Sequence, residues 1–184
     1  MTRIRVFGSV LLLAATVALM TAPGAVAASR QELNRDGIKV LQTLYAKNPA
    51  ARRLGEKARA VLVFPSITKA GFMFGGQLGE GVLLKGGKPT AYYNTVAASF
   101  GLQAGAQTFG YALFFMNDGA LAYLDKSEGF ELGVGPSIVV VDEGMGKSIT
   151  SSTLTQDIYA LIFSQKGLMA GMGIQGSKIT RISK

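Results

Sequence analysis

Glycines recur inside the apolar segments that follow residue 60, and they constrain the fold of this chain more than any other feature. The chain has 184 residues, and 24 of them are glycine. Between residues 60 and 182, short apolar or alternating runs are separated by turn signals such as Gly86-Gly87-Lys88-Pro89. Glycine inside a strand marks a bulge or a sharp bend. The region therefore predicts an antiparallel sheet curled into a barrel-like or sandwich-like shape.

The positions of these runs predict the individual elements of the sheet. We expect strands over residues 60–64, 69–85, 90–96, 99–107, 109–116, 130–141 and 178–182. The strand over 130–141 should be interrupted at Gly135-Pro136. Residues 157–163 and 168–175 should pair as a hairpin joined by 164–167. A short helix is expected over 120–126 behind an Asn117-Asp118 cap, and an exposed loop over 145–155.

Two helices are predicted before the sheet. Ser29 and Glu32 have the spacing of a capping box. Apolar residues then recur at helical spacing on one face, with charged residues opposite. Asn48-Pro49 ends this first helix and begins a second one over residues 50–59. The predicted fold class is therefore α+β, with two N-terminal helices packed on a strongly curved, mainly antiparallel, glycine-rich sheet.

The first 28 residues have the pattern of a secretory signal peptide. Arg3 and Arg5 form a basic start, residues 10–20 are apolar, and Ala25-Val26-Ala27 is a small-x-small cleavage site. The apolar run is shorter than the roughly 20 residues of a membrane span. We therefore expect residues 1–28 to be a signal peptide and residues 29–184 to form one domain, with a helical basic arm over 29–59 and a mainly β part over 60–184. The expected location is periplasmic or secreted, with peripheral membrane association.

Positive charge is confined to one stretch of the chain. Residues 30–69 contain nine Lys or Arg and three acidic residues, whereas residues 70–184 contain eight of each sign. Such an asymmetry indicates an anionic partner, which is a membrane surface or a nucleic acid. Export favours a membrane or another polyanionic component of the cell envelope, and no nucleic acid partner is expected.

The chain contains no cysteine and no histidine. Disulfides, thiolate metal sites and a lipid-modified cysteine are therefore excluded. The commonest general base and the commonest metal ligand are also absent, so the serine and threonine hydroxyls have no histidine partner. These absences predict a binding protein without a catalytic site, a metal site or a cofactor.

The basic arm supplies the candidate site residues. The candidate electrostatic contacts to anionic lipid are Arg52, Arg53, Lys57, Arg59 and Lys69. Each basic residue near an anionic bilayer contributes about 1 kcal/mol. The candidate inserting face of the first helix is formed by Leu33, Val40, Leu41 and Leu44. The sequence leaves open whether this apolar face inserts into a membrane or packs on the core.

Three ordered glycine-rich motifs resemble those of the SYLF domain family. The opening motif comprises Phe64-Pro65, Lys69-Ala70-Gly71-Phe72, Gly75-Gly76 and Gly79-Glu80-Gly81-Val82; the central one is Ser99-Phe100-Gly101-Leu102-Gln103-Ala104-Gly105-Ala106-Gln107; the closing one is Lys166-Gly167-Leu168-Met169-Ala170-Gly171 with Gln175-Gly176-Ser177. The resemblance covers roughly residues 33–182. It implies a lipid-binding module, because eukaryotic members bind phosphoinositides, in part through an amphipathic N-terminal helix. Yeast relatives also bind actin, and bacterial members are typically exported.

The chain departs from the family pattern in two places. The family often has Tyr-Ser-Arg-Ser before its closing motif, where this chain has Ile162-Phe163-Ser164-Gln165. Tyr92-Tyr93-Asn94 replaces an aromatic-then-proline feature. These changes argue against specific phosphoinositide recognition and leave general binding of anionic phospholipid as the predicted function. Actin is not expected as a partner in a cell envelope. The alternative function is an envelope protein-protein interaction or assembly module whose basic charge is incidental.

Overall fold

The computed structural model describes residues 28–126, 130–141, 154–167 and 176–184. It is an α+β fold, as the sequence predicted, with helices at the N-terminal end and a strongly curved sheet. The elements in chain order are α1 (Arg30–Lys47), α2 (Pro49–Lys57), β1 (Ala60–Lys85), β2 (Lys88–Phe115), α3 (Asp118–Lys126), β3 (Phe130–Glu131), β4 (Ile138–Val140), β5 (Ile158–Gly167) and β6 (Lys178–Ile182).

The long hairpin of β1 and β2 organises the sheet. The predicted turn is confirmed, because Gly86 and Gly87 both have positive φ, at 56° and 76°, as a tight hairpin turn requires. The five short strands expected between residues 60 and 116 are wrong, since they are two continuous strands of 26 and 28 residues. Their register shifts between Phe64 and Ile67, between Phe72 and Phe74, and between Leu83 and Leu84. The proline and glycine signals mark bends within strands, where we expected strand ends.

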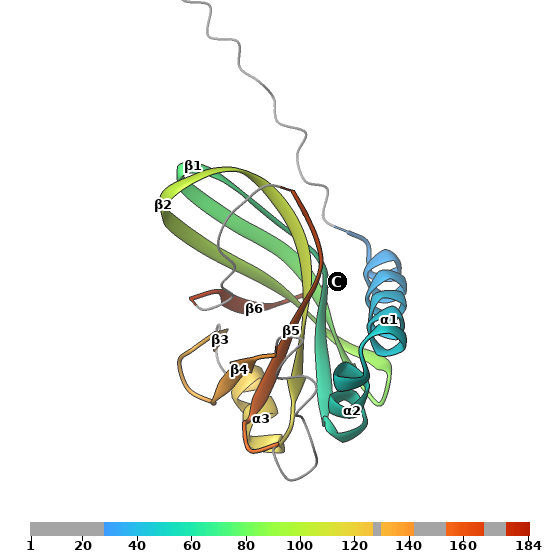
Figure 1. Ribbon diagram of the computed structural model, residues 1–184. Helices are drawn as coiled ribbons and strands as arrows, with labels where there is room; N and C mark the ends of the chain where they lie inside the picture. Colours follow the sequence, from blue (N-terminus) through green and yellow to red (C-terminus); the bar gives the residue numbers. More distant parts are fainter. Residues whose placement is uncertain (1–27, 127–129, 142–153, 168–175) are drawn as a thin grey trace, which may run out of the picture.

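The bends bring β1 across itself. A Cβ on Gly81 would lie 2.7 Å from Cδ1 of Phe64 and 2.8 Å from the carbonyl oxygen of Val63. A Cβ on Gly79 would overlap Ile67 and lie 2.8 Å from the carbonyl oxygen of Ser66. Only glycine lets the two halves of the strand approach so closely. Figure 1 shows the resulting arch of β1 and β2.

The remaining strands flank the hairpin. The first half of β2 pairs with β6 and its second half with β5, both antiparallel, while β4 pairs parallel to β5. The predicted strand over 178–182 is confirmed, as is the interruption before β4. The expected turn over 164–167 is wrong, because β5 continues to Gly167. Ser164, with φ of 54°, lies at this irregular part of the strand. Residues 168–175 and 145–153 lie outside the described residues.

Apolar side chains cover both faces of the sheet. In β1, Ala60, Leu62 and Phe64 point to one core, whereas Val61 and Val63 point to the other, as the period of two along a strand dictates. The first core also contains residues of α3, and the second contains residues of α1 and α2. The helices therefore lie on opposite faces of the curved sheet (Figure 1).

The predicted starts of α1 and α2 are confirmed by their caps, although α2 ends at Lys57, before the predicted end at residue 59. The Ser29 hydroxyl accepts the Glu32 amide at 3.2 Å, and the Glu32 carboxylate accepts the Ser29 amide at 2.9 Å. These bonds hold the pKa of Glu32 below its usual value. The Asn48 side chain accepts the amides of Ala50 and Ala51 at the start of α2.

The helix predicted after β2 is confirmed in the same way. The Asn117 side chain accepts the Ala120 amide at 2.8 Å. Side-chain acceptors of this kind satisfy the amides that a first helical turn leaves unpaired.

Candidate functional site

The apolar face of α1 is covered by the sheet. Leu33, Leu41 and Leu44 are at most 9% exposed and belong to the core that α1 shares with β1, β2 and β5. Val40 is partly buried against the same core. In this conformation, the side chains of the candidate inserting face pack on the core.

A glycine on this face explains how closely α1 approaches the sheet. A Cβ on Gly37 would overlap Cγ1 of Val82 and lie 3.8 Å from its Cβ. Polar contacts hold the same helix in place, because the Tyr92 hydroxyl donates to Asn34 Oδ1 at 3.0 Å and the Arg30 guanidinium lies 5.9 Å from the Tyr92 ring centre. The helix is therefore docked by apolar and polar contacts together.

The structure separates the five predicted electrostatic residues into two groups. Arg52, Lys57 and Arg59 are exposed, on α2 and at the residue before β1. Arg53 is partly buried, with a buried Nε. Lys69 is only 8% exposed within β1, so it does not join the exposed basic surface. Its alternating position on β1, opposite Gln107 of β2, turns it to the covered side of the strand.

Acidic neighbours offset part of this charge. Arg52 Nε lies 3.4 Å from a Glu56 oxygen, and Arg59 Nε lies 3.7 Å from an Asp118 oxygen. In both pairs each side chain is more than 60% exposed. Exposed ion pairs are weak and screened by salt, so these guanidinium groups can exchange their partners for another anion.

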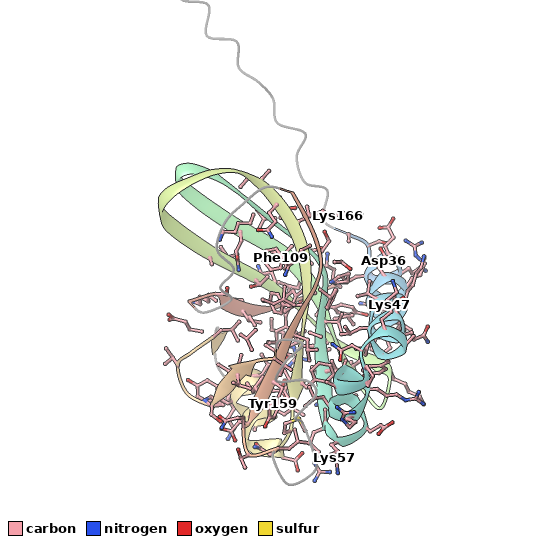
Figure 2. The ribbon with its side chains drawn as sticks, in the orientation of Figure 1. Asp36, Lys47, Lys57, Phe109, Tyr159 and Lys166 are labelled. Carbon is pink, nitrogen blue, oxygen red and sulfur yellow. The ribbon has the colours of Figure 1, made fainter. Side chains whose placement is uncertain are left out.

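Two further cations, both on α1, border a groove. The groove encloses about 960 Å³ between α1 and β5. Val40 and Leu44 of α1 and Leu161 and Phe163 of β5 supply apolar wall, and Lys39 and Lys47 of α1 contribute ammonium groups. Figure 2 labels Lys47 on α1 and Lys57 at the end of α2. A groove with an apolar wall and cationic residues suits an amphiphile with an anionic head.

Sequence reasoning did not identify Lys39 and Lys47 as site residues. Their spacing with Thr43, four residues apart on one helix, was a visible signal. The opposite wall was not visible, because residues 161–165 follow α1 by more than 100 positions and only the β5 pairing brings them there. The charge of the arm was therefore readable from the sequence, and the groove was not.

The described residues show no arrangement of catalytic groups. No group of three or more Asp or Glu residues among them could hold a metal ion. Ser66 and Lys69 have the Ser-x-x-Lys spacing that some acyl-transfer enzymes place on a helix, but here both lie on β1, where Ser66 is exposed and Lys69 is buried. The spacing therefore does not bring the hydroxyl and the amine together.

Three tyrosines have raised pKa values because their side chains are buried. Burial raises the pKa of Tyr45 to about 12, and burial also raises the pKa values of Tyr93 and Tyr111. The Tyr93 hydroxyl donates to Asp125 and the Tyr111 hydroxyl donates to Thr95. These groups stay neutral, and the bond of Tyr93 joins β2 to α3. Separately, none of the described helices is long and apolar enough to cross a membrane.

A scan against protein families found one match. Residues 96–184 match the model described as Ysc84, Las17-binding protein actin regulator. No curated protein was found that matches the chain. The matched segment runs from β2 to β6 and includes the central and closing glycine motifs. The match over residues 96–184 is consistent with the SYLF family that the glycine motifs predicted, and this family is one of binding domains.

Proposed function

We propose that this protein binds anionic phospholipid at a membrane surface, without catalysis, through the helical layer of α1 and α2. In this proposal the chain is exported by its N-terminal signal peptide and acts in the periplasm or outside the cell. The observation that carries the proposal is the set of exposed cations on and next to α1 and α2, of which Lys39 and Lys47 border the groove between α1 and β5. The family match supports a binding role.

The expected binding free energy is that of a protein attached peripherally to a membrane. The exposed cations of the layer include Lys39, Lys47, Arg52, Lys57 and Arg59. At about 1 kcal/mol each, they contribute about 5 kcal/mol, which corresponds to a Kd of a few tenths of a millimolar. The groove adds apolar contact for part of a lipid. The attachment should weaken strongly as salt rises, because the cations are exposed.

In this proposal α1 takes part while it stays docked on the sheet. Leu33, Leu41 and Leu44 stabilise the docked helix, so binding does not require them to leave the core. The lipid instead meets the outer side of the helices and the groove. Specific headgroup recognition is not part of the proposal, because exposed cations supply charge density without a shaped pocket.

Flotation with vesicles tests this function. The purified chain from residue 28 to residue 184 contains every described element, so it is mixed with phosphatidylcholine vesicles, with or without phosphatidylglycerol, at low and high salt. We expect flotation only with the anionic vesicles at low salt. The triple variant Arg52→Glu, Lys57→Glu, Arg59→Glu should stay at the bottom of the gradient.

A matched control reverses three exposed cations outside the helical layer. Lys126→Glu, Lys178→Glu and Arg181→Glu change α3 and β6, and they alter the net charge by the same amount. This variant should float almost as well as the parent protein. Equal loss in both variants would show that net charge alone drives the effect, and equal flotation of both would contradict the assignment to α2.

One observation favours the alternative of an envelope protein-protein interaction. Leu78 and Val96 are 55% and 51% exposed, and they are cross-strand partners on β1 and β2. An exposed apolar pair suits contact with another protein. If the folded protein does not float under any condition, this alternative is favoured over lipid binding.

A further inference from the structure

Ala28, the first residue that the structure describes, is held by a side chain from the second half of β1. Its amide donates to Glu80 Oε2 at 3.0 Å. The Lys184 ammonium donates to the same carboxylate oxygen at 2.8 Å and also to the Ala28 carbonyl oxygen at 2.6 Å. Ala28 before the cap of α1, Glu80 in the second half of β1 and Lys184, two residues beyond β6, are thus joined at one carboxylate.

The site is partly enclosed. The Lys184 side chain is 10% exposed and the Glu80 side chain is 25% exposed. A second cavity, of about 370 Å³, is bordered by Ala28, Glu80, Asn94 and Thr95, and also by Asp36. Asp36 also pairs with Arg35 at 2.9 Å. Two carboxylates therefore border the cavity, and that of Glu80 contacts the nitrogen of Ala28.

A neutral amide forms a weaker interaction at such a site than an ammonium group would. An amide N–H donates one hydrogen bond and carries no charge, whereas an α-ammonium group has three N–H donors and a positive charge. Hydrogen bonds to charged partners are about twice as strong as neutral ones. The peptide bond between Ala27 and Ala28 directly follows Ala25-Val26-Ala27, where small residues at the first and third positions before the bond suit a signal peptidase.

We propose that the chain is processed between Ala27 and Ala28 and that the new α-ammonium group of Ala28 forms an ion pair with Glu80. Water hydrolyses the peptide bond in a protease of the export machinery, which leaves a carboxylate on Ala27 and an amine on Ala28. The amine takes up a proton and keeps the position of the former amide. The mature chain then begins at Ala28, one residue before the Ser29 start expected from the sequence. This inference does not depend on lipid binding.

The pair would link processing to the order of the arm. Ser29 is the cap of α1, and it directly follows Ala28. Fixing Ala28 therefore restrains the first turn of the helix that carries Lys39 and Lys47. An unprocessed chain has an amide at this position, so it lacks the charged part of the interaction.

Three chain starts separate the charge from the other contacts. One chain begins at Ala28, a second begins at Ser29, and a third has Gly-Ser-Gly before Ala28, so that it keeps the amide but has no charge there. Urea unfolding is followed by circular dichroism. The unfolding equilibrium constant should be about tenfold larger for the second and third chains than for the first.

Glu80→Gln in each chain completes the cycle. This substitution should remove the difference between the first and third chains, whereas Glu131→Gln, at an exposed position of β3, should preserve it. If Glu80→Gln prevents folding, the comparison of the three starts still decides the matter. Equal stability of the first and third chains would overturn the ion pair.

Sequencing the N-terminus of the exported protein tests the cleavage position directly. We expect the sequence Ala-Ser-Arg-Gln, from Ala28 onward. A start at Ser29, or retention of residues 1–27, would overturn the proposal.

Discussion

A disulfide between positions 37 and 82 would hold α1 on the sheet and test whether membrane binding needs the helix to leave it. A Cβ at position 37 would lie 3.8 Å from the Val82 Cβ, within the roughly 3.5–4.5 Å that disulfides span. Val82→Cys also removes the Cγ1 that a Cβ at position 37 would overlap. Since the chain has no cysteine of its own, the Gly37→Cys, Val82→Cys variant can form only this intramolecular bond.

The expected gain in stability follows from the loop that the bond closes. The loop runs from residue 37 to residue 82, and closing about 46 residues in the unfolded chain is worth about 4 kcal/mol in the chain-entropy model. Losing the two Val82 methyl groups costs about 1 kcal/mol in both redox states. Because that cost cancels, the free energy of unfolding should be about 4 kcal/mol higher in the oxidised variant than in the reduced one. Urea midpoints with and without reductant measure this difference.

Flotation of the same variant decides between the two roles of α1. Because the proposed binding uses exposed cations and the groove, the oxidised form should float with anionic vesicles as well as the reduced form does. The single-cysteine variants, treated with the same oxidant, control for the substitutions. Flotation of the reduced form alone would refute this reasoning and return binding to insertion of Leu33, Val40, Leu41 and Leu44. Failure of the bond to form would refute the packing of α1 on β1.

Three further predictions follow from the structure. Gly81→Ala should destabilise the protein by about 1–3 kcal/mol through overpacking, because the contacting Val63 oxygen is backbone and cannot turn away. Gly76→Ala, whose Cβ would meet only the Ala97 oxygen at 3.7 Å, should change stability by less than about 0.5 kcal/mol in urea unfolding; similar effects of the two substitutions would contradict the crossing of β1. At high pH, ionisation of Tyr45 should reduce stability between about pH 10 and 12, because its folded pKa lies above the unfolded value of 10; Tyr45→Phe should flatten the stability curve there. At low pH, the pKa of Asp157 is lowered by hydrogen bonds from Ser137 and Asn117, so its stabilising contribution is present above the unfolded value of 3.8 and is lost as pH falls through the lower folded value; Asp157→Asn should remove this acid dependence, and an unchanged acid limb would contradict it.

The helices could be predicted because their signals are local. The Ser29 and Glu32 pair, the Asn48-Pro49 step and the Asn117 cap each act within a few residues, through hydrogen bonds to the first helical turn. Tertiary contacts do not change that chemistry. The fold class followed from the same local signals, together with the glycine-rich runs.

The strand boundaries could not be predicted because the same residues signal a turn or a bend. Pro65 lies where the β1–β2 register shifts, and β1 continues through it. Gly86 and Gly87 end β1, whereas Gly79 and Gly81 permit its crossing. A glycine in the sequence states only that a side chain is absent. Whether the chain reverses there or another backbone approaches depends on residues far along the chain.

The role of the candidate site residues could be predicted only in part from the sequence. The spacing of Leu33, Leu41 and Leu44 satisfies membrane insertion and core packing equally, because both require one apolar face. The decisive signal is Gly37 on that same face, since a helix that meets fluid lipid does not need a missing Cβ, whereas a helix packed against Val82 does. The exposed cations of α2 did not need such a partner, because long charged side chains reach solvent from most positions on a short surface helix. Lys69 lies on a strand and not on a helix, so its burial follows from the alternation of side chains along β1. Charge could therefore be assigned to the arm from the sequence, but the direction from which a membrane meets that charge depended on how the sheet curves.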